Sequence, residues 1–183
     1  MIRGIVFDCF GVLYGGSLSV LVEACPEDKR QELADLNKQT DYGFISQEEY
    51  YKGSAEVIGK SYEQVEELIN RKHARHEEVF DCLRELKSRG QYKIGLLSNV
   101  GASTIQELFS ADELENLFDA VVLSYEESIA KPNPEIYALM ARRLDLSPEE
   151  CVMIDDLEVN CDGAEIAGMQ SIWHINPNDT RVK

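Results

Sequence analysis

Asp8 is the first residue of the chain whose type and setting suggest chemistry. It follows the apolar run 2–7, which indicates a buried strand, and Gly11 comes three residues later. The glycine allows the chain to turn without a Cβ atom in the way. In open α/β sheets, ligands bind at the carboxyl ends of the strands, where Asp8 would lie. Its carboxylate could bind a metal, act as a nucleophile or cap a turn.

Polar side chains follow three further apolar runs. In chain order they are Ser98 with Asn99, Lys131 before Pro132, and Asp155 with Asp156. Together with Asp8, they supply carboxylates, a hydroxyl group and an ammonium group. Two adjacent aspartates at a strand end repel each other unless a metal or another cation is near. The pair could therefore hold a metal ion, or it could cap the helix that follows.

The elements that would carry these residues form two different patterns. From Tyr92 onward, strand-like runs alternate with helical ones, which predicts a parallel sheet with right-handed crossovers. Between Leu18 and Gly90 there is no strand pattern, but Ser46 and Ser61 each start a helix-capping box. We therefore expect an α/β, Rossmann-like core (1–16 and 79–183) interrupted by a helical segment (17–78). The tail at 176–179 has turn-forming residues and is expected to fray.

These motifs resemble those of the haloacid dehalogenase-like hydrolase superfamily, which consists mostly of phosphatases with an aspartate nucleophile. The resemblance covers roughly residues 1–14 and 90–175. It rests on four motifs in the family's order: the Asp8 loop, Ser98-Asn99, Lys131-Pro132, and Asp155-Asp156 continuing through Asn160, Gly163-Ala164 and 167–169. The resemblance implies the subfamily IA type, in which a helical insertion after the first strand forms a cap over the active site.

The resemblance also implies roles for the catalytic and metal-binding residues. Asp8 would attack phosphorus and form an aspartyl-phosphate, which divides a difficult hydrolysis into two easier steps. Lys131 would neutralise the charge of the nucleophile and of the phosphate. Mg²⁺ prefers oxygen ligands, which here would be Asp8, the backbone carbonyl of Phe10, and the acid pair. In the family, the second acid of that pair (here Asp156) typically touches the metal and the first (Asp155) supports it.

Three further residues are expected to bind phosphate or substrate. Ser98 would donate a hydrogen bond to a phosphate oxygen, although its hydroxyl could equally cap the helix after Gly101. Asn99 would face the cap or the substrate. Asn160 lies one helical turn beyond Asp156, so its amide could face the site or solvent.

Phe10 departs from the family pattern. The phosphatases usually carry a second aspartate two residues after the nucleophile, which protonates the leaving oxygen and later activates water. Phenylalanine can do neither, and positioned acid–base groups typically contribute about 10²–10⁴-fold in rate. We therefore expect a preference for leaving groups of low pKa, unless another residue, for instance from the cap, supplies the proton.

Composition narrows the possible partners and the location. Among 183 residues, 34 acidic and 18 basic side chains give a formal net charge of −16, which argues against nucleic acid and anionic membranes as partners. No apolar run approaches the length of about eighteen residues that spans a bilayer, and no secretory signal is visible. The five scattered cysteines are typical of reduced thiols. We expect a cytoplasmic protein that acts on a small phosphorylated substrate.

Two alternatives to a Mg²⁺-dependent phosphatase remain open. A 2-haloacid dehalogenase also lacks the second aspartate and has a tyrosine there, so Phe10 fits that branch moderately. However, the dehalogenases need no metal, lack the acid pair, and usually have an arginine soon after the first motif, whereas no basic residue lies between Tyr14 and Cys25. The other alternative is a non-catalytic protein that binds a phosphorylated ligand or a partner. In such a protein, we would expect the motif residues to be replaced by other residues.

Overall fold

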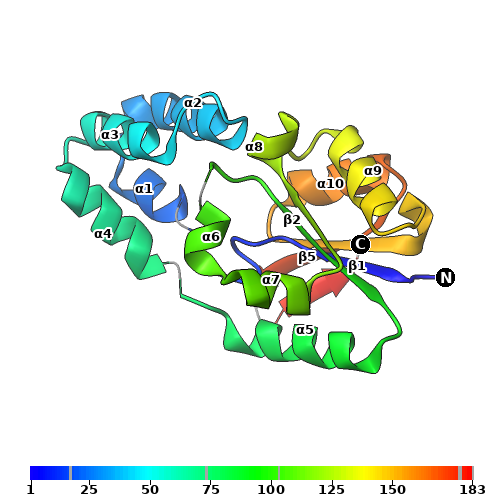
Figure 1. Ribbon diagram of the computed structural model, residues 1–183. Helices are drawn as coiled ribbons and strands as arrows, with labels where there is room; N and C mark the ends of the chain where they lie inside the picture. The colour runs from blue at the N-terminus through cyan, green and yellow to red at the C-terminus, as the bar shows by residue number, and fades with distance from the viewer. Residues whose placement is uncertain (17, 73, 103, 177–178, 183) are drawn as a thin grey trace.

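A six-stranded sheet, in the order β3-β2-β1-β4-β5-β6, forms the centre of the computed structural model (Figure 1). The structure describes residues 1–16, 18–72, 74–102, 104–176 and 179–182. The strands β1 to β5 are parallel, and β6 runs antiparallel to β5. Their bounds are β1 (Gly4–Phe7), β2 (Lys93–Ser98), β3 (Ala120–Leu123), β4 (Cys151–Asp155), β5 (Gln170–Asn176) and β6 (Asp179–Val182).

The register of the sheet brings the strand ends level with one another. β1 lies between β2 and β4, and Phe7 is paired with Leu96 of β2 and with Ile154 of β4. The pairing continues one residue further, because the backbone N–H of Asp8 donates to the carbonyl of Ile154 at 2.9 Å. The polar residues that follow β1 and β4 therefore lie side by side at the carboxyl edge of the sheet, where α/β folds bind their ligands.

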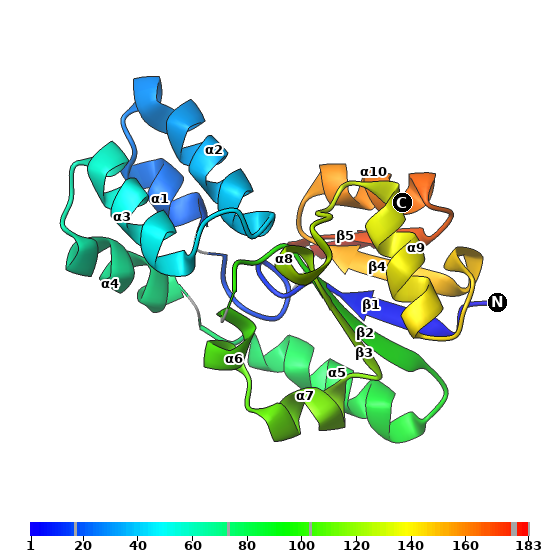
Figure 2. The ribbon, with the colours of Figure 1, turned by 45° about the horizontal axis from the view of Figure 1, so that its top comes forward.

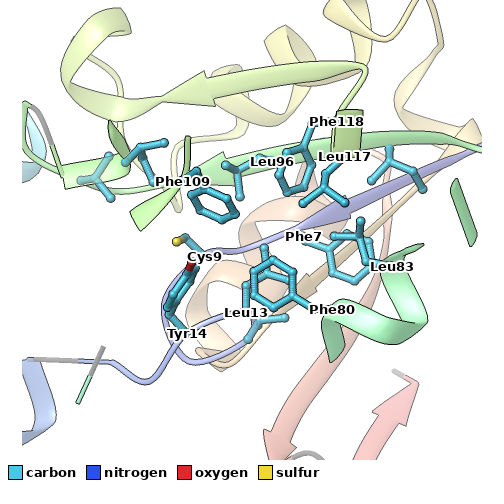
Figure 3. Close-up of a cluster of buried hydrophobic side chains, with 14 of the residues drawn as sticks. Phe7, Cys9, Leu13, Tyr14, Phe80, Leu83, Leu96, Phe109, Leu117 and Phe118 are labelled. Atoms are coloured by element: carbon cyan, nitrogen blue, oxygen red, sulfur yellow. The ribbon is translucent and has the colours of Figure 1, made fainter. Parts of the chain in front are cut away.

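Helices cover both faces of the sheet (Figure 2). On one face, α5 (Glu77–Arg89), α6 (Thr104–Leu108) and α7 (Ala111–Leu117) pack over a core that includes Phe7, Phe80 and Phe109 (Figure 3). On the other face, α9 (Pro134–Arg143) and α10 (Glu158–Ile166) enclose a second apolar cluster. Burial on both faces is the reason that the strands read as continuous apolar runs.

Four α-helices of the described chain between β1 and α5, with a short 3-10 helix (Glu27–Lys29), form a separate layer, here called the helical insertion (Figure 2). They are α1 (Leu18–Ala24), α2 (Arg30–Asp41), α3 (Gln47–Ile58) and α4 (Tyr62–Lys72). Their buried apolar side chains form a cluster of their own that extends from Leu21 to Ile69. The predicted fold class, a parallel sheet core with an inserted helical cap, is confirmed. The exact boundaries at 16/17 and 78/79 stay a prediction.

Two neighbouring segments connect the helical insertion to the sheet core. The backbone N–H of Gly15 donates to the carbonyl of Ala74 at 3.0 Å, and the N–H of His76 donates to the carbonyl of Leu13 at 2.9 Å. The outgoing and returning chains are thus hydrogen-bonded to each other at the crossing. None of the described helices is both long and apolar enough to cross a membrane.

The prediction that the C-terminal tail frays is wrong for the residues that the structure describes. β6 pairs with β5, and Ile172 lies opposite Val182 while His174 lies opposite Thr180. The physical reason is that β5 would otherwise present an unpaired edge, whose backbone groups the returning tail satisfies. Residues 177 and 178, at the predicted turn, lie outside the described residues.

Candidate active site

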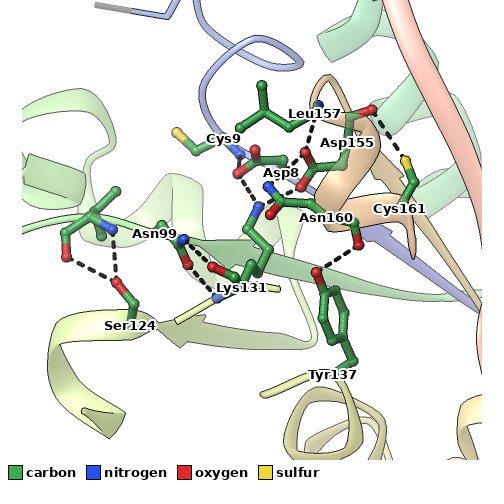
Figure 4. A network of polar contacts seen from close by, with 11 residues as sticks. Asp8, Cys9, Asn99, Ser124, Lys131, Tyr137, Asp155, Leu157, Asn160 and Cys161 are labelled. Carbon is green, nitrogen blue, oxygen red and sulfur yellow. Dashed lines mark hydrogen bonds and ion pairs between the residues drawn. The ribbon is translucent and has the colours of Figure 1, made fainter. Parts of the chain in front are cut away.

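Lys131 is the central charge of a buried cluster at the carboxyl edge of the sheet (Figure 4). Its Nζ atom lies 2.9 Å from Oδ1 of Asp8 and 2.6 Å from Oδ2 of Asp155, and its side chain is 1% exposed. Burial alone would disfavour the ammonium ion, but Asp155 and Asp8 outweigh that effect and raise the pKa of Lys131 above its ordinary value. The lysine is therefore charged at neutral pH and links two strand ends.

Asn99 fixes the backbone on which Lys131 is carried. Its Oδ1 accepts from the backbone N–H of Lys131 at 2.8 Å, and its Nδ2 donates to the carbonyl of Lys131 at 2.9 Å. The peptide bond between Lys131 and Pro132 is cis. Asn99 was predicted to face the cap or substrate. It does line the cavity described below, but the contacts shown by the structure are those that position the lysine.

Asp155 is held by protein donors on both of its oxygens. Oδ2 meets Lys131, while Oδ1 accepts from the backbone N–H of Leu157 and from Nδ2 of Asn160, both at 2.9 Å. The carbonyl of Asn160 in turn accepts from the hydroxyl of Tyr137 at 2.7 Å (Figure 4). Asn160, expected to bind phosphate, thus also orients an acid of the cluster.

Asp8, Asp155 and Asp156 together form a group that could hold a divalent cation. One oxygen from each lies within 4.8 Å of the others. Burial, followed by repulsion from Asp155, raises the pKa of Asp156 to about 6. Burial also raises the pKa of Asp8 well above its ordinary value, although Lys131 opposes this effect. Hard carboxylate oxygens that repel one another are the donors a hard cation would stabilise, so the residues fit Mg²⁺.

Gly11 shows why the loop after β1 requires a glycine. Its φ angle is +81°, and a Cβ atom there would lie 2.1 Å from the carboxyl group of Asp156. Any other residue would have a strained backbone and would push Asp156 out of the cluster. The loop is thereby kept against the acid pair.

Two predicted site residues, Ser98 and Phe10, are not part of the cluster around Lys131. Ser98, at the end of β2, is buried, and its hydroxyl has no hydrogen-bond partner among the described residues. It is not among the residues that line the cavity. Phe10 lines the cavity and packs on the apolar cluster beneath it. The proposed role of the Phe10 carbonyl as a metal ligand stays a prediction.

A cavity of about 470 Å³ lies between the cluster and the helical insertion. The core contributes Asp8, Lys131 and Asp156 to its lining. The helical insertion contributes polar side chains that were not identified from the sequence, namely Asn37, Thr40, Asp41, Gln47, Tyr50 and Tyr51. One sequence signal was available for Asp41, because an acid in the last turn of a helix is unfavourably placed relative to the helix dipole.

Comparison with known proteins identifies the family. The family model described as haloacid dehalogenase-like hydrolase matches residues 2–168. The chain belongs to the haloacid dehalogenase-like hydrolases. This confirms the family expected from the four motifs, and with it that the protein is a hydrolase.

Curated relatives of this hydrolase include phosphatases. The glyceraldehyde 3-phosphate phosphatase of Methanopyrus kandleri is 28% identical over 94% of this chain and 83% of its own length. Pyrophosphatase PpaX of Bacillus mycoides is 30% identical over 61% of this chain. The match spans 50% of that PpaX, so the chain spans about half the length of the PpaX relatives.

Solved structures of similar fold include a complex with magnesium. The HAD family enzyme bt-2542 of Bacteroides thetaiotaomicron, in complex with magnesium and inorganic phosphate, has a TM-score of 0.73 and 26% identity, and the match covers 94% of each chain. The L-2-haloacid dehalogenase of Xanthobacter autotrophicus has a TM-score of 0.62 and 20% identity over 93% of this chain and 76% of its own. That second likeness is one of fold alone.

Proposed function

We propose that this hydrolase is a Mg²⁺-dependent phosphatase that acts on small phosphorylated compounds through an aspartyl-phosphate on Asp8. The observation that carries the proposal is the buried cluster in which Lys131 bridges Asp8 and Asp155. The phosphatase relatives and the magnesium and phosphate complex of the bt-2542 enzyme support it.

The geometry of Asp8 suits a nucleophile. Its described contacts, from the backbone N–H of Cys9 at 2.7 Å and from Lys131, both engage Oδ1. Oδ2 is therefore the oxygen that would attack phosphorus as the bond to the leaving oxygen breaks. Water would then attack the aspartyl-phosphate at phosphorus and release Asp8 and inorganic phosphate. Throughout, Lys131 stabilises the carboxylate form of Asp8 and attracts the phosphoryl group.

The two acids of the pair would have different roles, because Asp156 would bind the metal and Asp155 would support the ligands. Both oxygens of Asp155 are taken by protein donors, so Asp8, Asp156 and the Phe10 carbonyl would hold Mg²⁺ while Asp155 supports them. When bound, the ion supplies positive charge that offsets repulsion between the phosphoryl group and the acids. We also propose residues 17–78 as the cap and 1–16 with 79–183 as the core, because both parts line one cavity.

The cavity lining favours the phosphatase over the dehalogenase. A dehalogenase needs a cation to hold the carboxylate and halide of its substrate, and usually uses arginine. None of the described residues that line the cavity is an arginine. The acid pair, which a metal-free dehalogenase does not need, is present, and protein donors hold both oxygens of Asp155. A purely binding protein would not need a nucleophile, the role that we propose for Asp8 beside Lys131.

A panel of phosphate esters tests this proposal. The unsubstituted protein should release phosphate with Mg²⁺ and lose that activity in EDTA, and Asp8→Asn should be inactive. Asp112→Asn, an exposed aspartate of α7, serves as the matched control and should keep its activity. Full turnover in EDTA, or in Asp8→Asn, would contradict the proposal, and release of halide from 2-haloacids without metal would replace it with the dehalogenase.

A further inference from the structure

Phe10 leaves the proposed reaction without its usual acid and base, but the cavity holds another carboxyl group. Asp41 is the last residue of α2 and lines the cavity together with Asp8 and Lys131. Of the described carboxyl groups that line the cavity, it is the one supplied by the helical insertion. We propose that Asp41 is the general acid and base of the phosphatase reaction, in place of the side chain that Phe10 lacks; this inference rests on the proposed function.

Hydrogen bonds within the helical insertion orient Asp41. Its Oδ2 accepts from Nδ2 of Asn37, one turn earlier on α2, at 2.9 Å. Oδ1 of Asn37 in turn accepts from the hydroxyl of Tyr50 on α3 at 3.2 Å. All three side chains line the cavity. These hydrogen bonds hold Oδ2 of Asp41 in place, so Oδ1 is the oxygen available for proton transfer.

Contacts on both sides of Asp41 hold it over the core. Thr40 lies against Gly101, where a Cβ atom would meet the Thr40 methyl group at 3.4 Å. Gly43 lies against α8 (Ser124–Glu127), where a Cβ atom would meet the carbonyl of Tyr125 at 3.2 Å. In Figure 2 the end of α2 accordingly approaches α8 at the edge of the sheet. Asp41 lies between these contacts, which place it beside the strand-edge cluster in this arrangement of the two parts.

The surroundings of Asp41 allow it to both give and take a proton near neutral pH. Burial raises its pKa to about 7, and the Lys131 ammonium partly opposes that rise. Two phenols lie nearby, those of Tyr50 on α3 and, beyond Gly43, of Tyr125 on α8, and the carboxyl groups of Asp8 and Asp156 line the same cavity. The pKa of each phenol is raised, chiefly by burial, so both are neutral at pH 7. A group whose pKa lies near the working pH is the most effective acid–base catalyst.

In the two chemical steps of the proposed reaction, Asp41 alone gives and takes the proton. In the first, Oδ2 of Asp8 attacks phosphorus, the bond from phosphorus to the leaving oxygen breaks, and the carboxylic acid of Asp41 gives that oxygen its proton. In the second, the Asp41 carboxylate takes a proton from water as the water oxygen attacks phosphorus. The bond from phosphorus to Asp8 breaks, inorganic phosphate leaves, and Asp41 is protonated again.

Asp41→Asn tests this role against a series of leaving groups. The amide keeps the shape of the side chain and can still accept from Asn37. We expect kcat/KM for alkyl phosphates to fall by about 10²–10⁴-fold, while kcat/KM for p-nitrophenyl phosphate, whose leaving group needs no proton, changes little. Because the base for the second step is also lost, p-nitrophenol should appear in a burst. Asp35→Asn, an exposed acid on the same helix, should leave both substrates unaffected.

Two further measurements make the test independent of how well one variant folds. Adding Phe10→Asp to Asp41→Asn places a carboxyl group at the family's usual position and should restore alkyl phosphate turnover. In the unsubstituted protein, kcat/KM for alkyl phosphates should fall as pH rises through about 7, because Asp41 loses its proton. The fall should be absent with p-nitrophenyl phosphate.

The outcomes separate this inference from the proposed function. Suppose that the unsubstituted protein hydrolyses the esters. If Asp41→Asn then loses activity equally with all leaving groups, or loses none, the role of Asp41 alone is overturned. Identical pH profiles for alkyl and aryl esters would do the same. No turnover of any ester with Mg²⁺ by the unsubstituted protein would overturn the proposed function and this inference with it.

Discussion

At the scale of single residues, the site depends on one buried cation between two buried anions. Removing a charge from water costs several kcal/mol unless close partners offset it. Lys131 offsets that cost for Asp8 and Asp155 together, and Leu157 and Asn160 supply the remaining hydrogen bonds to Asp155. Lys131 thereby opposes the rise in the pKa of Asp8 that burial causes, and so favours the carboxylate form.

Lys131→Met removes the cation while keeping a side chain of similar length. We expect loss of phosphatase activity and, in EDTA at neutral pH, a decrease in the free energy of unfolding of about 3–5 kcal/mol, because two buried carboxylates lose their partner. The decrease should shrink as pH is lowered, since protonation removes the uncompensated charge. Urea unfolding at several pH values measures this.

Lys52→Met is the matched control for this prediction. Lys52 pairs with Glu48 at 2.5 Å, but both side chains are more than half exposed, at 60% and 67%. Exposed ion pairs contribute little to stability because solvent screens them, so little should change. If Lys131→Met were as stable as the Lys52→Met variant, the buried cluster would not have the energetic role described.

Three of the strand-edge residues were predictable from a local rule, because Asp8, Asp155 and Asp156 stand at the ends of apolar strands. Lys131 follows β3 only after α8 and a loop, so its place in the site was predicted from the resemblance to the family and not from spacing. Asn99 and Asn160 proved to contact Lys131 and Asp155, partners that depend on the approach of two loops. Asp41 was not predicted, because only the docking of α2 on the core brings it to the cavity.

At the scale of elements, the starts of helices could be predicted from local sequence signals, whereas the packing of one element against another could not. The capping boxes at Ser46 and Ser61 are confirmed by hydrogen bonds within three residues, which sequence spacing alone specifies. Strand β6 was missed because its residues carry no strong strand pattern and its pairing depends on the open edge of β5. The contact between the end of α2 and α8 likewise arises from tertiary packing.

Ser46→Ala tests the start of α3, the helix that carries Tyr50. The Ser46 hydroxyl accepts from the backbone N–H of Glu49 at 3.2 Å, and its loss leaves that donor without its partner. We expect the free energy of unfolding to fall by about 1 kcal/mol. Ser110→Ala removes the same device from α7 in the core, at the same distance of 3.2 Å, and should cost a similar amount. A Ser46→Ala variant with unchanged unfolding would contradict the capping role.

At the scale of the whole molecule, the sheet core and the helical insertion meet at the cavity that both of them line. The helical insertion has its own buried cluster and joins the sheet core through two adjacent segments near Leu13–Gly15 and Ala74–His76. Such a connection allows one part to move against the other without disrupting either core. The formal net charge of −16 makes local positive charge at the site important, and Lys131 supplies it.

Closure of the helical insertion should be visible by hydrogen exchange. When Mg²⁺ and inorganic phosphate bind, we expect slower amide exchange at the end of α2 and in the facing loop 99–102, because ligand favours the closed arrangement. Amides of α5, on the far side of the sheet, should exchange at unchanged rates. Equal protection with and without ligand at the end of α2 would show that the insertion does not move.

The most direct test of the account is to identify the residue that carries the phosphoryl group during turnover. Protein quenched with acid while hydrolysing p-nitrophenyl phosphate with Mg²⁺, then reduced with borohydride, should carry its modification on the peptide that contains Asp8. Asp8→Asn should show neither the modification nor turnover. A phosphoryl group found on another residue, or turnover that persists in Asp8→Asn, would contradict the assignment of Asp8 as the nucleophile.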